Sequence, residues 1–154
     1  MTMETIEYVG SGGVTLMADV RGDPDANPIL FMHGGGQTRH SWGGAAELLA
    51  ERGWQTISID LRGHGDSGWS EEGDYEAEHF AADINAVLAT LGRKAVLVGA
   101  SLGGRTATFV VGNGVPDLCR ALVLVDITPK IETKGVERIL AFMNKHPDGF
   151  ETVE

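Results

Sequence analysis

The sequence has a single cysteine, few basic residues and no long apolar run. Cys119 alone cannot form a disulfide within the chain, and no cysteines and histidines stand at a zinc-binding spacing. Twelve Lys and Arg residues against 22 Asp and Glu residues give a net charge of −10, and such an acidic surface would repel nucleic acid. The start of the chain lacks the pattern of a signal peptide, and no stretch reaches the ~18 apolar residues of a membrane helix. We therefore expect a cytoplasmic protein that contacts neither nucleic acid nor a membrane and holds no metal.

Short strand-like runs alternate with helical patterns along most of the chain. This alternation is typical of strand-helix-strand units and predicts an α/β fold, a mostly parallel sheet with helices on both faces. Residues 6–9 and 14–20 are separated by Gly-Ser-Gly-Gly and predict a hairpin that leads into the sheet. The other expected strands are residues 29–32, 56–60, 95–98 and 121–125.

Four helices are predicted, three from apolar residues that repeat at helical spacing and one, the third, from a short segment rich in small residues that suit close packing against a sheet. The second pattern, from Phe80 to Leu91, has Asp74 as a plausible N-cap and ends at Gly92. The fourth is strongly amphipathic, because its apolar residues fall at i, i+3, i+4 and i+7. The expected helices cover residues 42–49, 80–91, 102–111 and 136–143, and residues 146–149 are expected to turn the chain.

Residues 99–103 form the motif G-x-S-x-G between a predicted strand and a predicted helix. A sharp turn in this place presents the serine hydroxyl above the end of the strand, beside the positive end of the helix. Glycine on both sides of the serine avoids clashes within the crowded turn. Ser101 is therefore our candidate nucleophile, although a glycine-rich turn without catalysis would show the same motif.

A second glycine-rich loop, residues 33–37, also comes directly after a predicted strand. Stabilising an oxyanion requires backbone N–H donors about 3 Å away, and residues without side chains allow that approach. We expect the amide of Gly35, then that of Gly36, to form an oxyanion hole with the amide of Leu102. His33 stands at the end of the strand, so we expect it to fix the loop and not to act as a base.

A third loop, residues 60–67, contains three residues that could be taken for catalytic groups. We expect Arg62, His64 and Asp66 to tie down a tight turn at the border of the site, because histidines in such motifs are often structural.

Together these motifs resemble the α/β-hydrolase superfamily, and in particular its serine esterases and cofactor-free perhydrolase-like enzymes. The resemblance implies a nucleophile at Ser101, an oxyanion hole of Gly35 and Leu102, and no cofactor. It implies a small-molecule ester as substrate, since relatives that open epoxides or remove halides have aspartate at the nucleophile position. It also implies a hydrolase core at residues 1–127 and the beginning of a helical lid at residues 128–154.

The chain departs from the family in the segment after Ser101. The family's order is Ser, then Asp or Glu, then His, with the last two beyond the lid. Here His146 is the only histidine after Ser101. We therefore expect a fold truncated after its sixth strand, and for Asp126 a structural role is favoured over that of catalytic acid.

Two other interpretations remain open at this stage. The chain could be an inactive or partner-dependent fragment, and its sheet would then end in an exposed edge that favours self-association. Residues 99–106 also resemble a phosphate-binding loop, but Arg105 stands where that loop needs lysine.

Overall fold

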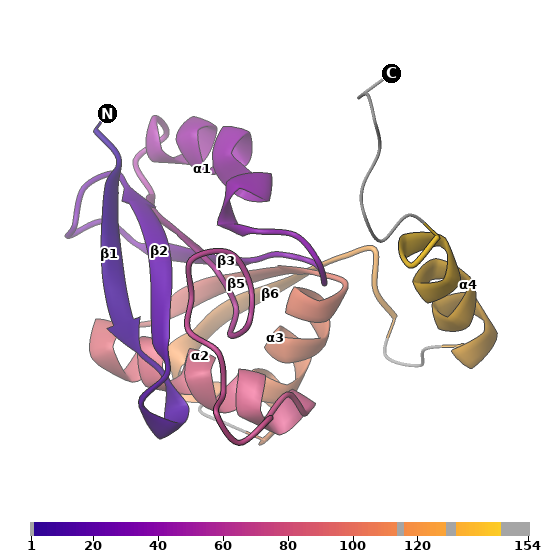
Figure 1. Ribbon diagram of the computed structural model, residues 1–154. Coiled ribbons are helices and arrows are strands. Elements are labelled where there is room, and N and C mark those ends of the chain that lie inside the picture. Colours follow the sequence, from indigo (N-terminus) through magenta and orange to yellow (C-terminus); the bar gives the residue numbers. More distant parts are fainter. Residues whose placement is uncertain (1, 114–115, 129–131, 146–154) are drawn as a thin grey trace.

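The six expected strands form one sheet in the computed structural model, which describes residues 2–113, 116–128 and 132–145 (Figure 1). Their order across the sheet is β1-β2-β4-β3-β5-β6. The first two strands form the predicted hairpin, and β2 also pairs antiparallel with β4, whereas β4, β3, β5 and β6 run parallel. The strands are β1 Glu4–Val9, β2 Thr15–Arg21, β3 Pro28–Met32, β4 Gln55–Ile59, β5 Ala95–Ala100 and β6 Cys119–Val125.

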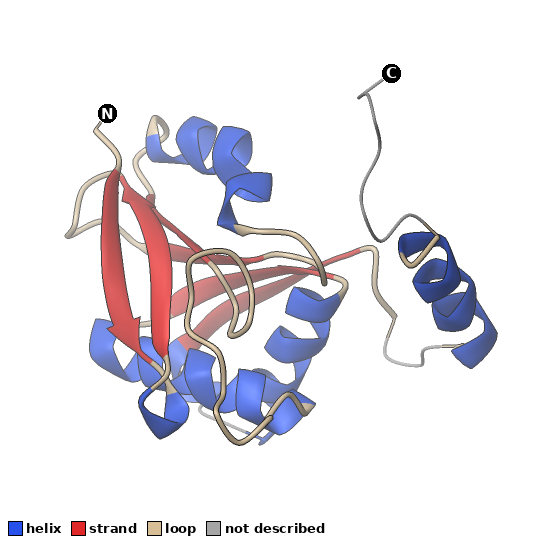
Figure 2. Ribbon diagram, viewed as in Figure 1, coloured by secondary structure: helices blue, strands red, loops and turns tan. Residues whose placement is uncertain are grey.

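Helices cover both faces of the sheet, as the sequence predicts (Figure 2). Every residue of β3 and β4 is buried, as expected of strands that are covered on both sides. Helix α1 (Gly43–Ala50) packs over Ile29 and Phe31, and successive residues of β3 point to opposite faces. Leu30 and Met32 therefore pack on the other face, in the core that α2 (Ala77–Leu91) and α3 (Leu102–Asn113) help to form.

The predicted end of α2 is confirmed, but its predicted N-cap is wrong. Gly92 has a φ of 62° and provides the left-handed cap. Glu76 occupies the N-cap position, and its side chain forms no capping hydrogen bond. Asp74 lies in the preceding loop, where its N–H donates to Ser70 Oγ and its carbonyl accepts from Arg62. Asp74 stands before the cap residue Glu76, and its Oδ1 lies 3.8 Å from Nε2 of His79 in the first turn of the helix.

The last described helix, α4 (Thr133–Met143), lies apart from the sheet (Figure 1). Its apolar residues are largely exposed, with Ile139 at 61% and Phe142 at 72%. The edge strand β6 likewise leaves Val123 44% exposed. Division into a core of residues 1–127 and a lid of residues 128–154 stays a prediction, as does self-association, and the turn expected at residues 146–149 lies outside the described residues.

A buried arginine fastens the loops at the carboxyl ends of the strands. Arg39 Nε donates to Asp19 Oδ1 over 3.0 Å and Nη1 donates to both Asp60 and Asp66. The backbone N–H of Arg39 also donates to Asp60. Burial alone would raise the pKa of Asp19, but the hydrogen bonds from Arg39 and Thr5 hold that pKa below its ordinary value. One cation thus joins β2 to the loops that come after β3 and β4.

His33 joins the same two loops through its imidazole ring. Its Nδ1 donates to the carbonyl of Gly34 over 2.8 Å, and its Nε2 accepts the N–H of Leu61 over 3.0 Å. Burial lowers the pKa of His33, and the nearby His64 lowers it further. The ring is therefore neutral and fully used in hydrogen bonds, which agrees with the structural role expected for it.

Replacing Arg39 by methionine should destabilise the fold by about 3–5 kcal/mol, because it leaves buried carboxylates without a counter-charge. Urea denaturation at pH 7 measures the loss. Arg52→Met is the matched control, since Arg52 is exposed, and it should change the unfolding free energy by about 0.5 kcal/mol or less. A similar small change for Arg39→Met would show that the network contributes little.

The His33 ring should make the fold less stable as the pH falls. The pKa of His33 is lowered in the folded state, whereas in the unfolded chain this histidine binds a proton near pH 6.5. Below pH 6.5 the unfolded state therefore binds more protons than the folded state. Stability should fall through this window and level off below the folded pKa. His33→Gln should reduce the slope of unfolding free energy against pH, measured between pH 8 and 5. An unchanged slope would contradict a neutral buried ring.

Candidate active site

Ser101 stands on a strained turn between β5 and α3. Its φ of 44° is one of two positive values among the described residues other than glycine, and the second, 52°, belongs to Asp126. The N–H of Ser101 donates to the carbonyl of Val125 over 3.2 Å, and its own carbonyl accepts the N–H of Arg105 over 2.9 Å. The turn is thus held by β6 on one side and by the first turn of α3 on the other. This is the strand-turn-helix arrangement that the G-x-S-x-G motif predicts.

The two glycines of the motif are required by close backbone packing. A Cβ atom at Gly99 would collide with the carbonyl of Gly103, and one at Gly103 would collide with the carbonyl of Met32. The N–H of Gly103 donates to the carbonyl of His33 over 3.0 Å. Helix α3 therefore begins in direct contact with the end of β3, which brings the loop after β3 next to Ser101.

The loop after β3 presents free backbone amides beside the serine. A Cβ atom at Gly34 would lie 3.6 Å from that of Ser101, and the N–H of Gly34 already donates to Gln37 Oε1 over 3.0 Å. Among the described residues, the amides of Gly35, Gly36 and Leu102 donate to no other group. These are the three amides that the sequence suggested as an oxyanion hole, and all three residues line one pocket with Ser101.

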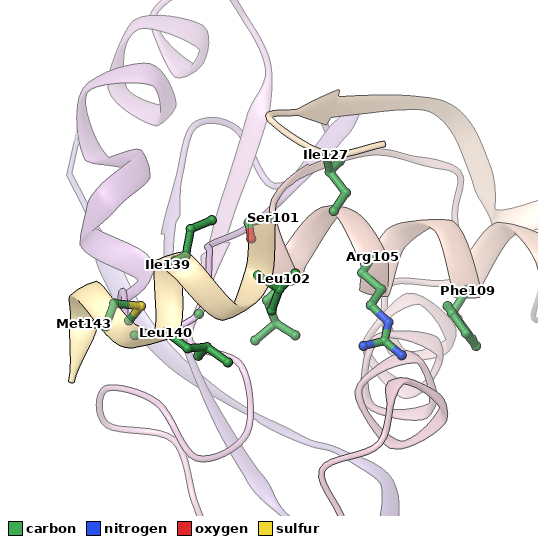
Figure 3. Close-up of a pocket in the computed structure, with 11 residues that line it drawn as sticks. Ser101, Leu102, Arg105, Phe109, Ile127, Ile139, Leu140 and Met143 are labelled. Atoms are coloured by element: carbon green, nitrogen blue, oxygen red, sulfur yellow. The ribbon is translucent and has the colours of Figure 1, made fainter. Parts of the chain in front are cut away.

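The pocket lies between α3 and α4 and has a volume of about 840 Å³ (Figure 3). Leu102, Arg105 and Phe109 form the α3 side, while Ile139 and Met143 are among the residues that α4 contributes. Most of this wall is apolar. Apart from Leu102, sequence reasoning did not assign these residues to the site, although Arg105 and Phe109 come after Ser101 at intervals of four and so share one helix face.

One further glycine shapes the pocket. A Cβ atom at Gly104 would lie 2.6 Å from Ile127 Cγ2 and 3.0 Å from the carbonyl oxygen of Gly99. Ile127 is itself a wall residue of the pocket. The space beside the serine therefore depends on the absence of a side chain at position 104.

Asp126 and the histidines differ in their relation to Ser101. Asp126 is the residue after Val125, whose carbonyl accepts the N–H of Ser101, so the backbone of Asp126 lies next to the turn that carries the serine. No histidine of the described residues is hydrogen bonded to Ser101. His64 Nδ1 lies 2.9 Å from the carbonyl of Arg62, within the loop that it was expected to fix, and His146 lies outside the described residues.

Ion pairs hold the loop at residues 60–67, and two of the three residues expected to tie it down form them. Arg62 binds both carboxylate oxygens of Asp83, each over 2.7 Å, and Asp66 binds Arg39. The hydrogen bond to Asp83 raises the pKa of Arg62. Within the described ranges, no three His, Cys, Asp or Glu side chains gather as metal ligands would, and no helix has the length and apolar character of a membrane span.

Two named relatives share much of this sequence. An esterase of Mycobacterium tuberculosis is 37% identical over 133 residues, which cover 86% of this chain and 42% of the relative. The 2-(acetamidomethylene)succinate hydrolase of Mesorhizobium japonicum is 37% identical over 147 residues, covering 95% of this chain and 51% of the relative. The chain thus spans about half the length of these curated relatives.

Solved structures show the same architecture. The crystal structure of E-2-(acetamidomethylene)succinate hydrolase superimposes with a TM-score of 0.82 at 34% identity, over 93% of this chain and 52% of the other. A thioesterase domain from the curacin biosynthetic pathway gives a TM-score of 0.78 at 27% identity. Residues 27–152 match the family described as the alpha/beta hydrolase fold. The sheet, the turn at Ser101 and these matches together show that the chain belongs to the α/β hydrolase family.

Proposed function

We propose that this chain provides the nucleophile and the oxyanion hole of a serine esterase. The observation on which this rests is the strained turn at Ser101, next to an apolar pocket and to three amides that are unpaired within the described residues. Two relatives, an esterase and a succinate-derivative hydrolase, cleave substrates by adding water. Serine at the turn favours acyl transfer, because a hydroxyl forms an ester with the acyl group of a substrate.

The chemistry would begin with attack of Ser101 Oγ on the ester carbonyl. The hydroxyl proton passes to a general base, and the carbonyl oxygen becomes an oxyanion that the amides of Gly35 and Leu102 bind. When the tetrahedral intermediate collapses, the ester C–O bond breaks and the alcohol leaves with the proton from the base. Water then cleaves the acyl-serine by the same steps, which gives the carboxylic acid and regenerates Ser101. Loss of one oxyanion donor typically costs about 10²–10³ in rate.

A complete triad needs an acid and a base beside Ser101. Asp126 is a candidate for the acid that orients a histidine, because it stands in the turn that carries the carbonyl bound to the Ser101 amide. The base would come from a segment outside the described residues or from another chain. If no segment or partner supplies the base, the same arrangement at Ser101 would be an inactive or partner-dependent fragment. A nucleotide-binding loop finds no support in the family match.

In the chain joined to the C-terminal half of the M. tuberculosis esterase, Ser101→Ala should abolish covalent labelling by an uncharged activated phosphonate and leave the fold unchanged, since alanine differs only by the hydroxyl. Intact-protein mass spectrometry measures the adduct, and circular dichroism checks the fold. Ser41→Ala is the control, because Ser41 is exposed and outside the pocket. Equal labelling of Ser101→Ala and the parent chain would remove Ser101 as nucleophile.

The chain alone should hydrolyse an activated ester at a rate close to the uncatalysed one. Without a base the serine is a weak nucleophile. Triad enzymes that lose one triad member still accelerate the reaction by about 10³- to 10⁴-fold, but this residual acceleration requires a complete substrate pocket. Joining it to the C-terminal half of the M. tuberculosis esterase should raise turnover by several orders of magnitude. Enzyme-like turnover by the chain alone, abolished in Ser101→Ala, would mean that a base is already present, with His146 or a second subunit as its source.

A further inference from the structure

We propose that Arg105 is a specificity-determining residue that binds a carboxylate on the acyl part of the substrate. The pocket would then select esters whose acyl chain is apolar near the ester carbonyl and carries a negative charge at its far end. This inference rests on the proposed esterase function and adds the class of ester. Its basis is the position and lack of partners, within the described residues, of one cation in an otherwise apolar pocket.

Arg105 lies in the pocket at a fixed interval from the nucleophile. It comes four residues after Ser101, which is a rise of about 6 Å along a helix. Figure 3 shows Leu102 and Arg105 on the same side of α3, with Phe109 one turn farther along. The guanidinium carbon lies 5.8 Å from the centre of the Phe109 ring, a cation–π contact that occupies none of the N–H donors. A charge bound there would lie on the order of 6–12 Å from Ser101.

The guanidinium of Arg105 has no acidic partner in the part of the chain that the structure describes. The buried arginines differ in this respect, since Arg39 binds three carboxylates and Arg62 binds Asp83. None of the described residues that line the pocket is acidic, although the chain has a net charge of −10. The guanidinium of Arg105 is therefore available to bind an anionic ligand, although acidic side chains outnumber basic ones in this protein.

The surroundings of this cation favour a carboxylate. A guanidinium presents paired N–H donors that match the two oxygens of a carboxylate. The apolar side chains of Ile127, Ile139 and Leu140 line the same pocket, in which Arg105, Ile139 and Leu140 are exposed to solvent. A charge pair formed there would have the modest strength of an exposed ion pair. The acyl chain between ester and carboxylate would pack against the same apolar side chains.

The test compares two uncleaved ligands of equal length, the monoamide of octanedioic acid and octanediamide, which differ in one carboxylate. Isothermal titration of the full chain at pH 7.5 and low salt measures both dissociation constants. We expect the carboxylate to bind about threefold to fivefold more tightly, which is the effect of an exposed ion pair. Arg105→Met should abolish this ratio, and Arg105→Lys should keep part of it.

Arg52→Met is the matched control, because it removes the same charge from an exposed position outside the pocket, and it should keep the full ratio. The proposal is overturned if the carboxylate shows no advantage, if Arg105→Met retains the advantage, or if neither ligand binds at millimolar concentration. Labelling of Ser101 by an uncharged phosphonate is scored separately, in the chain joined to the C-terminal half of the M. tuberculosis esterase. Loss of labelling with intact charge selectivity would defeat the esterase proposal, and intact labelling without selectivity would defeat only the anion subsite.

Discussion

Backbone contact between α3 and the end of β3 is the constraint on which the site depends. Gly103 lies against the carbonyl of Met32 so closely that no side chain fits between them. This contact sets the distance between the amide of Leu102 and the loop that contains Gly35. Leu102 is next to Gly103 in the sequence, and Gly35 comes shortly after Met32. Movement of the helix by the width of a methyl group would separate the two halves of the proposed oxyanion hole. The position of Ser101 relative to these amides is therefore set by packing between glycines and the sheet.

Buried polar groups maintain this geometry from the opposite side. Arg39 and His33 use their donors and acceptors to connect loops that come after different strands. Such networks are costly to bury and stabilise only when every partner is present. Their value to the protein is that each loop has one favoured position. The nucleophile turn, by contrast, has a strained backbone, and strain persists only where the surroundings determine the conformation.

The sequence was sufficient to predict the six strands, the helices on both faces and the turn at Ser101. These features depend on local patterns, since alternation, apolar runs and glycine spacing act over a few residues. The N-cap of α2 was missed because Asp74 is held by Arg62 and Ser70, and these contacts depend on tertiary structure. The pocket wall was also missed. Residues of α4 and the side chain of Arg105 meet only after the chain has folded, so spacing along the sequence gave little indication of them.

The contact between position 104 and Ile127 links the size of the pocket to evolutionary change. An alanine at position 104 would need room that the Ile127 side chain now occupies, and the Gly99 carbonyl would also have to give way. Members of the family with a larger residue at position 104 should therefore have a smaller one at position 127, so that the two positions covary. Such paired exchanges would reshape the pocket while leaving Ser101 and the neighbouring backbone amides in place. A single glycine on α3 would then influence how readily this scaffold acquires new substrates.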